Sequence, residues 1–166
     1  EDLFTVHSLG FRGEALYSIS AISDVILRSR TAEQDTGWEI HLRGGKRLDL
    51  RPAAMPVGTE VEVQELFFNT PARRKFLKSN TTEMSQVLGV VIPYLLHHPQ
   101  CRFLVRHQDK TIFDLAPDKS YLNRAAEVLN LNVDHLTELK HDQPEQNLRV
   151  HLTLGDINIA RSRRDM

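Results

Sequence analysis

The sequence predicts an α+β protein, a two-layer α/β sandwich in which helices cover a mostly antiparallel sheet. Segments with apolar residues at helical spacing occur in turn with segments that alternate apolar and polar residues, in the order helix, strands, helix, strands, helix, strands. Two pairs of expected strands are joined by two-residue turns, which connect antiparallel neighbours.

Composition and charge are those of a folded globular protein. The 166 residues are 40% hydrophobic and 26% charged, which is enough for a sizeable core. The net charge is −1, so no overall positive field attracts nucleic acid. Any contact with nucleic acid would have to come from a local basic patch.

Cysteine usage and hydropathy exclude several classes of protein. Cys101 is the only cysteine, which excludes an internal disulfide, and beside Phe103 and Val105 we expect it to be a buried structural thiol. No run of about 18 apolar residues occurs, and the acidic N-terminus lacks the order of a signal peptide. We therefore expect a cytoplasmic location without a membrane partner. Because the first residue is Glu1 rather than Met, we expect a piece of a longer protein.

A glycine-rich turn, Gly10-Phe11-Arg12-Gly13, leads directly into the first expected helix, from about Glu14 to Ile22. Glycine permits a positive φ and lets the backbone approach a ligand closely. The unpaired N–H groups at a helix start then suit a phosphate. The glycines could also serve only to form the turn, because the pattern is neither GxGxxG nor a P-loop.

The expected sheet follows this helix. Residues 25–30 are predicted as a strand, and residues 38–42 and 47–50 as a hairpin around Gly44-Gly45. Residues 51–56 contain two prolines without an N–H donor, so we expect a loop there. A further strand is expected over residues 59–66, with one face on the core.

A short basic helix is expected over residues 71–77. Asn69-Thr70-Pro71 begins it, since a capping residue precedes a proline at the first helical position. Arg74 and Lys78 fall at i, i+4 on one helical face, and Phe76 and Leu77 are expected to anchor the other side. The four cations of this segment are Arg73, Arg74, Lys75 and Lys78.

These four cations have two interpretations. They could follow a DNA backbone without reading its sequence, as phosphate contacts do. On composition alone, a solvated helix face explains them as well. In that case the neighbouring Glu60, Glu62 and Glu65 would neutralise part of the charge.

The second half of the chain repeats the pattern. A helix is expected from Asn80, where Asn80-Thr81-Thr82-Glu83 has capping-box order, and Pro93 should kink it or end it early. A hairpin over residues 101–106 and 111–115, a helix from Asp118 to about Asn130 and a strand over residues 148–154 follow. The buried face of the first of these helices is expected to contain Met84, Val87, Leu88, Val91 and Leu95.

Two stretches carry a resemblance to a known family. They are Gly-Phe-Arg-Gly-Glu-Ala-Leu at residues 10–16, and residues 58–78 with Gly-Thr-x-Val followed by Asn-Thr-Pro-Ala-Arg-Arg-Lys-Phe-Leu. With these motifs the chain strongly resembles the MutL family of DNA mismatch-repair ATPases. That family belongs to the wider group that includes DNA gyrase B subunits, Hsp90 chaperones and histidine kinases.

The resemblance implies an Hsp90-like ATPase fold that is truncated in this chain. Residues 1–117 would be the C-terminal part of the ATPase domain, with residues 2–8 in the ATP lid. Residues 118–131 would form a connecting helix. Residues 132–166 would begin a transducer domain with a fold like that of ribosomal protein S5.

The resemblance also assigns nucleotide-binding residues. Gly10, Phe11, Arg12 and Gly13 would contact the phosphates and shape the lid, and Gly58 and Thr59 would lie near the adenine. The family's catalytic glutamate, its Mg²⁺-binding asparagine and its Asp-x-Gly-x-Gly motif do not occur in this chain. We therefore assign no catalytic residue and no metal ligand here, although the complete protein would use ATP and Mg²⁺.

The implied function is an ATP-operated switch that couples mismatch recognition to strand incision through lid ordering and homodimerisation. The implied partners are DNA, bound non-specifically through residues 73–75 and 78, a MutS-type mismatch-recognition protein and a downstream endonuclease or helicase. The implied setting is the bacterial cytoplasm, at the nucleoid. Two alternatives are another ATPase of the wider group, and a DNA- or protein-binding module with no nucleotide site of its own.

Overall fold

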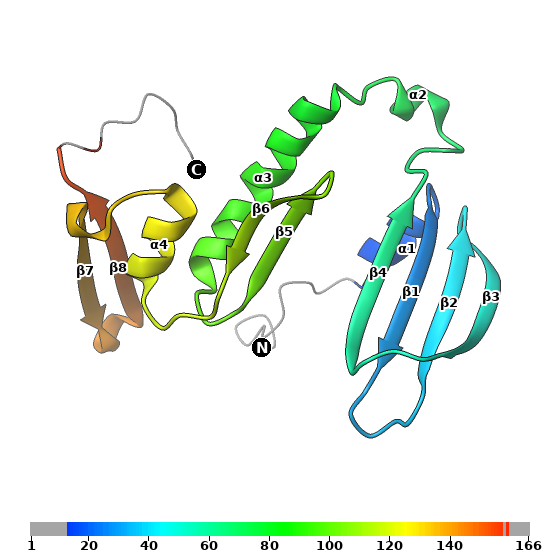
Figure 1. The fold of residues 1–166 in the computed structure, drawn as a ribbon, viewed down its shortest axis with the longest axis horizontal. Helices are drawn as coiled ribbons and strands as arrows, with labels where there is room; N and C mark the ends of the chain where they lie inside the picture. Colours follow the sequence, from blue (N-terminus) through cyan, green and yellow to red (C-terminus); the bar gives the residue numbers. More distant parts are fainter. Residues whose placement is uncertain (1–12, 158, 160–166) are drawn as a thin grey trace. The chain divides into compact units, whose positions relative to one another are not determined.

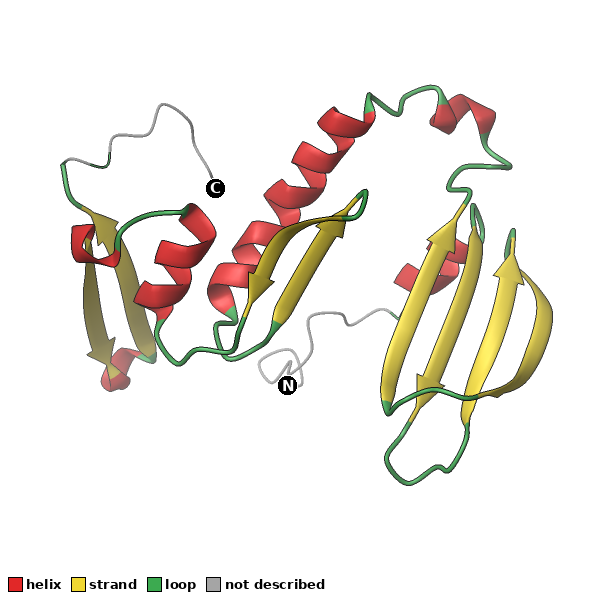
Figure 2. Cartoon of the chain, in the orientation of Figure 1, coloured by secondary structure: helices red, strands yellow, loops and turns green. Residues whose placement is uncertain are grey.

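The computed structural model describes residues 13–157 and 159 (Figure 1). The chain divides into two compact units, one ending at Leu77 and the other beginning at Lys78. Both units combine helices with strands, and every described strand pair is antiparallel, which confirms the predicted α+β class (Figure 2). The predicted domain boundaries, after residues 117 and 131, do not coincide with this division and stay predictions.

The first unit is a four-stranded antiparallel sheet in the order β3-β2-β1-β4. All six of its elements were predicted, with bounds shifted by at most three residues. They are α1 (Ala15–Ser20), β1 (Asp24–Arg30), β2 (Gly37–Arg43), β3 (Lys46–Ala53), β4 (Gly58–Gln64) and α2 (Pro71–Arg74).

The hairpin of β2 and β3 turns at two glycines with positive φ, +56° at Gly44 and +77° at Gly45. This is the backbone that two-residue hairpin turns require. The predicted loop over residues 51–56 was wrong at its start, since β3 continues through Pro52, which pairs with Trp38. β3 is an edge strand of the described sheet, with a neighbouring strand on one side only. A proline is tolerated there because its missing N–H can face the side without a described strand.

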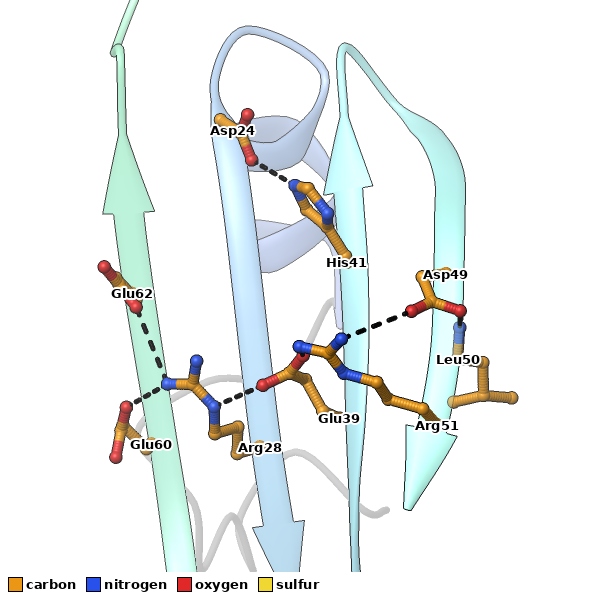
Figure 3. A network of polar contacts seen from close by, with 9 residues as sticks. All are labelled: Asp24, Arg28, Glu39, His41, Asp49, Leu50, Arg51, Glu60 and Glu62. Carbon is orange, nitrogen blue, oxygen red and sulfur yellow. Dashed lines mark hydrogen bonds and ion pairs between the residues drawn. The ribbon is translucent and has the colours of Figure 1, made fainter. Parts of the chain in front are cut away.

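The sheet has one apolar and one polar face. Val25, 1% exposed, lies on the apolar face in register with Leu42 and Val63. The polar face carries charged side chains from all four strands, and α1 lies behind the sheet on the opposite side (Figure 3). The predicted alternation along β4 holds, because Glu60 and Glu62 point to the polar face. The expectation that the other face of β4 lies on the core was wrong, since Val61 is 43% and Val63 44% exposed.

The second unit begins with the long helix α3 (Asn80–His97). It continues with the predicted hairpin and helix, then with a second hairpin of which only the last strand was predicted. These elements are β5 (Phe103–His107), β6 (Lys110–Leu115), α4 (Tyr121–Leu129), β7 (Leu136–Gln143) and β8 (Leu148–Gly155), with 3₁₀ turns at Val133–His135 and Pro144–Gln146.

Helix α3 is capped one residue earlier than predicted. Ser79 is the N-cap and accepts a hydrogen bond from the Thr82 N–H, while the Glu83 carboxylate accepts one from the Lys78 N–H. The expected early end at Pro93 was wrong, since the helix runs on to His97. Packing holds the turns after Pro93 in place, because Leu95 is fully buried.

The core of the second unit is formed where α3 and α4 meet the β5–β6 hairpin. Leu95, Leu115 and Val128 are its buried residues. The expected buried face of α3 extends only partly along the helix, because Val87 is 50% exposed. Cys101 is exposed, so the prediction of a buried thiol was wrong.

The largest fully buried side chain of the described chain is Arg124, on α4. Its Nη2 donates to three backbone carbonyls, those of Pro99 at 2.6 Å, Ala116 at 2.7 Å and Cys101 at 3.1 Å. Its Nε and Nη1 have no hydrogen-bond partner among the described residues. The guanidinium carbon lies 5.9 Å from the centroid of the Phe103 ring. Arg124 therefore connects α4 to the ends of two other segments.

Candidate functional site

The described part of the glycine turn is Gly13, and Gly10, Phe11 and Arg12 lie outside the described residues. Gly13 is exposed and has φ +66°, and a Cβ added there would meet no atom within 4 Å. The backbone at Gly13 is therefore open and in a conformation that favours glycine. Helix α1 has only six residues and no side-chain cap at Glu14, so its dipole is short.

Gly58 and Thr59 open strand β4. Gly58 has φ +143°, and a Cβ there would also meet no atom within 4 Å. Thr59 is exposed and pairs with Ser29 of β1, where the two hydroxyl oxygens lie 3.2 Å apart. The start of β4 thus offers an open backbone beside a pair of hydroxyl groups.

Arg30 holds the loops that lead to this position. Its Nη1 donates to the Met55 carbonyl at 3.0 Å, and its Nε donates to the Gln34 carbonyl at 2.9 Å. Arg30 itself pairs with Gly58 in the sheet register. Sequence reasoning did not single out Arg30 or Ser29, because their partners lie in other segments.

The polar face of the sheet is organised around Glu39, which is 7% exposed (Figure 3). Its carboxylate accepts from Arg28 Nε at 2.5 Å and pairs with Arg51 Nη2 at 2.6 Å. The hydrogen bond from Arg28 lowers the pKa of Glu39, although burial raises it, and Arg51 lowers it further. Arg28 also pairs with Glu60 and, at 3.5 Å, with Glu62.

A second cluster on the same face joins β1 and β2 to the end of β4. Asp24 pairs with His41 Nε2 at 2.6 Å and with Arg43. Although burial raises the pKa of Asp24, the hydrogen bonds from His41 and Arg43 outweigh it and the pKa is lowered. Arg43 also pairs with Glu65, and its guanidinium carbon lies 4.6 Å from the Phe68 ring centroid.

The basic segment begins at Thr70 and Pro71 as predicted, but it differs from its prediction in two ways. Helix α2 ends at Arg74, and Lys78 is not helical, so the i, i+4 pairing of the two was wrong. Phe76 is 79% exposed and does not anchor the segment. Asn69 donates its side-chain N–H to the Ala21 carbonyl at 2.9 Å, and Thr70 is the N-cap without a side-chain cap bond.

The charges of the basic segment are not neutralised by the neighbouring glutamates. Those three glutamates pair instead with arginines of the sheet, Glu60 and Glu62 with Arg28 and Glu65 with Arg43. Within residues 13–157 and 159, no ion pair is formed by the side chains of Arg73, Arg74, Lys75 or Lys78, all four of which are exposed.

Among the described residues, no group of three or more histidine, cysteine, aspartate or glutamate side chains could hold a metal ion. None of the helices in the same part of the chain has both the length and the hydropathy needed to cross a membrane.

The sequence is similar to bacterial DNA mismatch repair proteins MutL. Over 160 residues it is 38% identical to the MutL protein of Endomicrobium trichonymphae. The aligned region covers 96% of this chain and 27% of the relative. It is also 41% identical over 169 residues to the MutL protein of Pseudomonas entomophila. That alignment covers 100% of this chain and 27% of the relative. No family model matches the chain.

The fold is similar to solved MutL structures. The Aquifex aeolicus MutL ATPase domain complexed with ADP superposes with a TM-score of 0.72 at 41% identity, over 77% of this chain and 52% of that one. Another structure, of the ATPase domain from the bacterial mismatch repair endonuclease Aquifex aeolicus MutL, gives a TM-score of 0.67 at 36% identity. It covers 83% of this chain and 53% of that one.

The matches define how much of a relative this chain represents. The chain spans about a quarter of the length of the two relatives named above and about half of the solved ATPase domains. Sequence identity and fold agree over most of the chain, and the matched structures confirm the predicted Hsp90-like ATPase fold. This chain belongs to the MutL family of DNA mismatch-repair proteins.

Proposed function

We propose that this chain forms part of the ATP-binding region of a MutL protein that couples mismatch recognition to strand incision. The observation that carries the proposal is the similarity in sequence and fold to a MutL ATPase domain complexed with ADP. The open backbone at Gly13 and Gly58 supports the proposal, since a Cβ at either place would meet no described atom within 4 Å and glycine lets the backbone approach a ligand closely.

The proposed site uses the backbone of residues 10–13 for the phosphates and Gly58 with Thr59 for the base. Mg²⁺ and the water-activating glutamate belong to the complete protein, and no residue of this chain is assigned to either role. In the complete protein, ATP orders the lid and thereby favours the homodimer. This is a population shift, in which the nucleotide stabilises one of two states.

Calorimetric titration with ATP tests the proposal on this chain and on the full-length protein side by side. We expect saturable binding and slow hydrolysis for the full-length protein. For this chain alone we expect weak binding and no phosphate release, because a helix N-terminus at an exposed site contributes only about 1 kcal/mol. A full-length protein that binds no ATP would contradict the proposal.

The partners and location are proposed from family membership. They are a MutS-type mismatch-recognition protein, a downstream endonuclease or helicase, and a second copy of the full-length protein, in the bacterial cytoplasm at the nucleoid.

A second candidate function is non-specific DNA binding by the basic segment. The cations at Arg73, Arg74, Lys75 and Lys78 favour it, since they are exposed, form no ion pair within the described part of the chain, and Glu60, Glu62 and Glu65 are held by Arg28 and Arg43. Unpaired surface cations are free to replace the counterions of a DNA backbone.

Neutralising Arg74 or Lys78 to glutamine in the full-length protein is expected to weaken DNA binding equally for all sequences. Each change should reduce the slope of log affinity against log salt by about 0.9, the value for one phosphate contact. Fluorescence anisotropy with duplex DNA at several salt concentrations measures the slope. Lys119→Gln is the matched control, because Lys119 is exposed and lies outside the basic segment. If the slopes match that of the control, the segment does not bind DNA.

A further inference from the structure

We propose that Ser29 is a positioning residue for the nucleotide site, which acts by orienting the hydroxyl of Thr59. The inference rests on the proposed function, in which Thr59 contacts the base. The inference is based on the distance of 3.2 Å between Ser29 Oγ of strand β1 and Thr59 Oγ1 of strand β4. Either hydroxyl can be the donor at this distance, which is long for a hydrogen bond between hydroxyl groups.

The two side chains are brought together by the sheet register. Ser29 and Thr59 are direct partners in the antiparallel pair, so both point to the same face, next to the partners Leu27 and Val61. Strand β1 is paired on both sides, by β2 and by β4, which fixes the backbone at Ser29. The position of the Ser29 hydroxyl is therefore set by an interior strand rather than by a loop.

Each hydroxyl is the other's only hydrogen-bond partner in the described part of the chain. Thr59 is exposed, whereas Ser29 is half-buried. A hydroxyl has one donor and two acceptor positions, so Thr59 keeps bonding capacity after its contact with Ser29. Because Thr59 is exposed, this remaining capacity is accessible to a ligand at the start of β4.

This arrangement bears on the choice of base. A purine carries at its six-position either an amino group, which donates, or a carbonyl, which accepts. A hydroxyl that rotates freely can adapt to either group, whereas one bonded to a neighbour has fewer orientations and adapts less well to both. Discrimination between substrates requires such a constraint, because a site that adapts to both ligands binds both. Ser29 thus contributes to the preference for one purine in addition to the affinity.

A double-mutant cycle in the full-length protein tests the inference. The variants are Ser29→Ala, Thr59→Val and the double variant, with ATP and GTP affinities measured by calorimetry. Ser29→Ala is expected to weaken ATP binding about two- to fivefold, the effect of one weak neutral hydrogen bond, and to lower the ratio of ATP to GTP affinity. Thr59→Val should weaken binding at least as much, and adding Ser29→Ala to it should change nothing further.

Two controls separate positioning from a structural role. Ser29→Thr keeps the hydroxyl in a residue that suits a strand, and should restore ATP affinity and base preference. Ser85→Ala removes an exposed hydroxyl on α3 and should have no effect. Thermal unfolding without nucleotide should be the same for Ser29→Ala and the unmodified protein.

Three results would overturn the inference, and they are distinguishable. Equal losses from Ser29→Ala with and without Thr59→Val would show that Ser29 acts independently of Thr59. An unchanged affinity and base preference in Ser29→Ala, alongside a clear loss in Thr59→Val, would remove the role of Ser29 and leave the nucleotide site intact. Absence of ATP binding by the unmodified full-length protein would overturn the proposed function together with this inference.

Discussion

Replacing Arg124 with methionine is expected to lower the free energy of unfolding of the second unit by about 3 kcal/mol, since one buried and two part-buried hydrogen bonds from a charged donor are lost, each worth about 1 kcal/mol or more. The accepting carbonyls belong to Pro99, Cys101 and Ala116. Methionine fills much of the same volume but offers no N–H group. Most of the loss therefore comes from hydrogen bonding rather than from a cavity.

The position of these carbonyls explains why the effect should be large. Pro99 and Cys101 follow the end of α3, Ala116 follows β6, and Arg124 lies on α4. One guanidinium thus satisfies acceptors from two chain segments that meet next to the core of Leu95, Leu115 and Val128. No carboxylate of the described residues contacts the Arg124 guanidinium. Its direct hydrogen-bond partners are carbonyl oxygens.

Chemical denaturation of this chain, followed by circular dichroism, measures the change. Arg102→Met is the matched control, because Arg102 is 65% exposed and forms only a surface pair with Asp114. That control should change stability by less than about 0.5 kcal/mol. If Arg124→Met unfolds at the same denaturant concentration as the control, the carbonyl contacts do not stabilise the unit.

Local signals in the sequence predicted the elements whose cause is itself local. The Gly44-Gly45 turn and the turn at Gln108-Asp109 both have positive φ, as two-residue hairpins need. The end of α4 at Asn130 is another such case, since this asparagine takes the left-handed conformation at the C-cap. In each case the residues that decide the structure are neighbours in the chain.

The features that were not predicted depend on residues far apart in the sequence. Arg124 is a polar residue of an amphipathic helix, and its burial depends on carbonyls up to 25 residues away. Pro52 continues a strand because β3 has no neighbour on its outer side, which only the sheet order reveals. The pair of Ser29 and Thr59 depends on the register of strands 30 residues apart.

The candidate site divides in the same way. Gly13 and Gly58 were predicted from motifs, and both have the positive φ for which glycine is suited. The arginines that hold Glu60, Glu62 and Glu65 could not be foreseen, because Arg28 and Arg43 reach them across the sheet. Since those glutamates are engaged, the basic segment keeps more of its charge than composition suggests.

Replacing Gly13 with valine in the full-length protein is expected to reduce ATP-dependent dimerisation about 5- to 30-fold and to leave the folded units intact. Gly13 has φ +66°, where a β-branched residue is strongly disfavoured, by about 1–2 kcal/mol. An added Cβ would meet no atom of the described residues within 4 Å, so the expected effect comes from the backbone conformation. In the proposed mechanism this conformation belongs to the ATP-ordered state, and a cost of that size shifts the population about 5- to 30-fold.

Two further substitutions separate this backbone effect from the loss of a glycine as such. Gly13→Asn should retain part of the dimerisation, because asparagine tolerates a positive φ better than valine does. Gly89→Ala should retain all of it, since Gly89 is helical and a Cβ there meets open space. Cross-linking with and without ATP gives the dimer fraction, and thermal unfolding without nucleotide checks the fold. Because valine and asparagine differ in how well they tolerate a positive φ, the dimer fractions of the two Gly13 variants report on the backbone at Gly13. Equal cross-linking of Gly13→Val and the unmodified protein would show that a positive φ at this residue is not needed for the ATP-bound dimer.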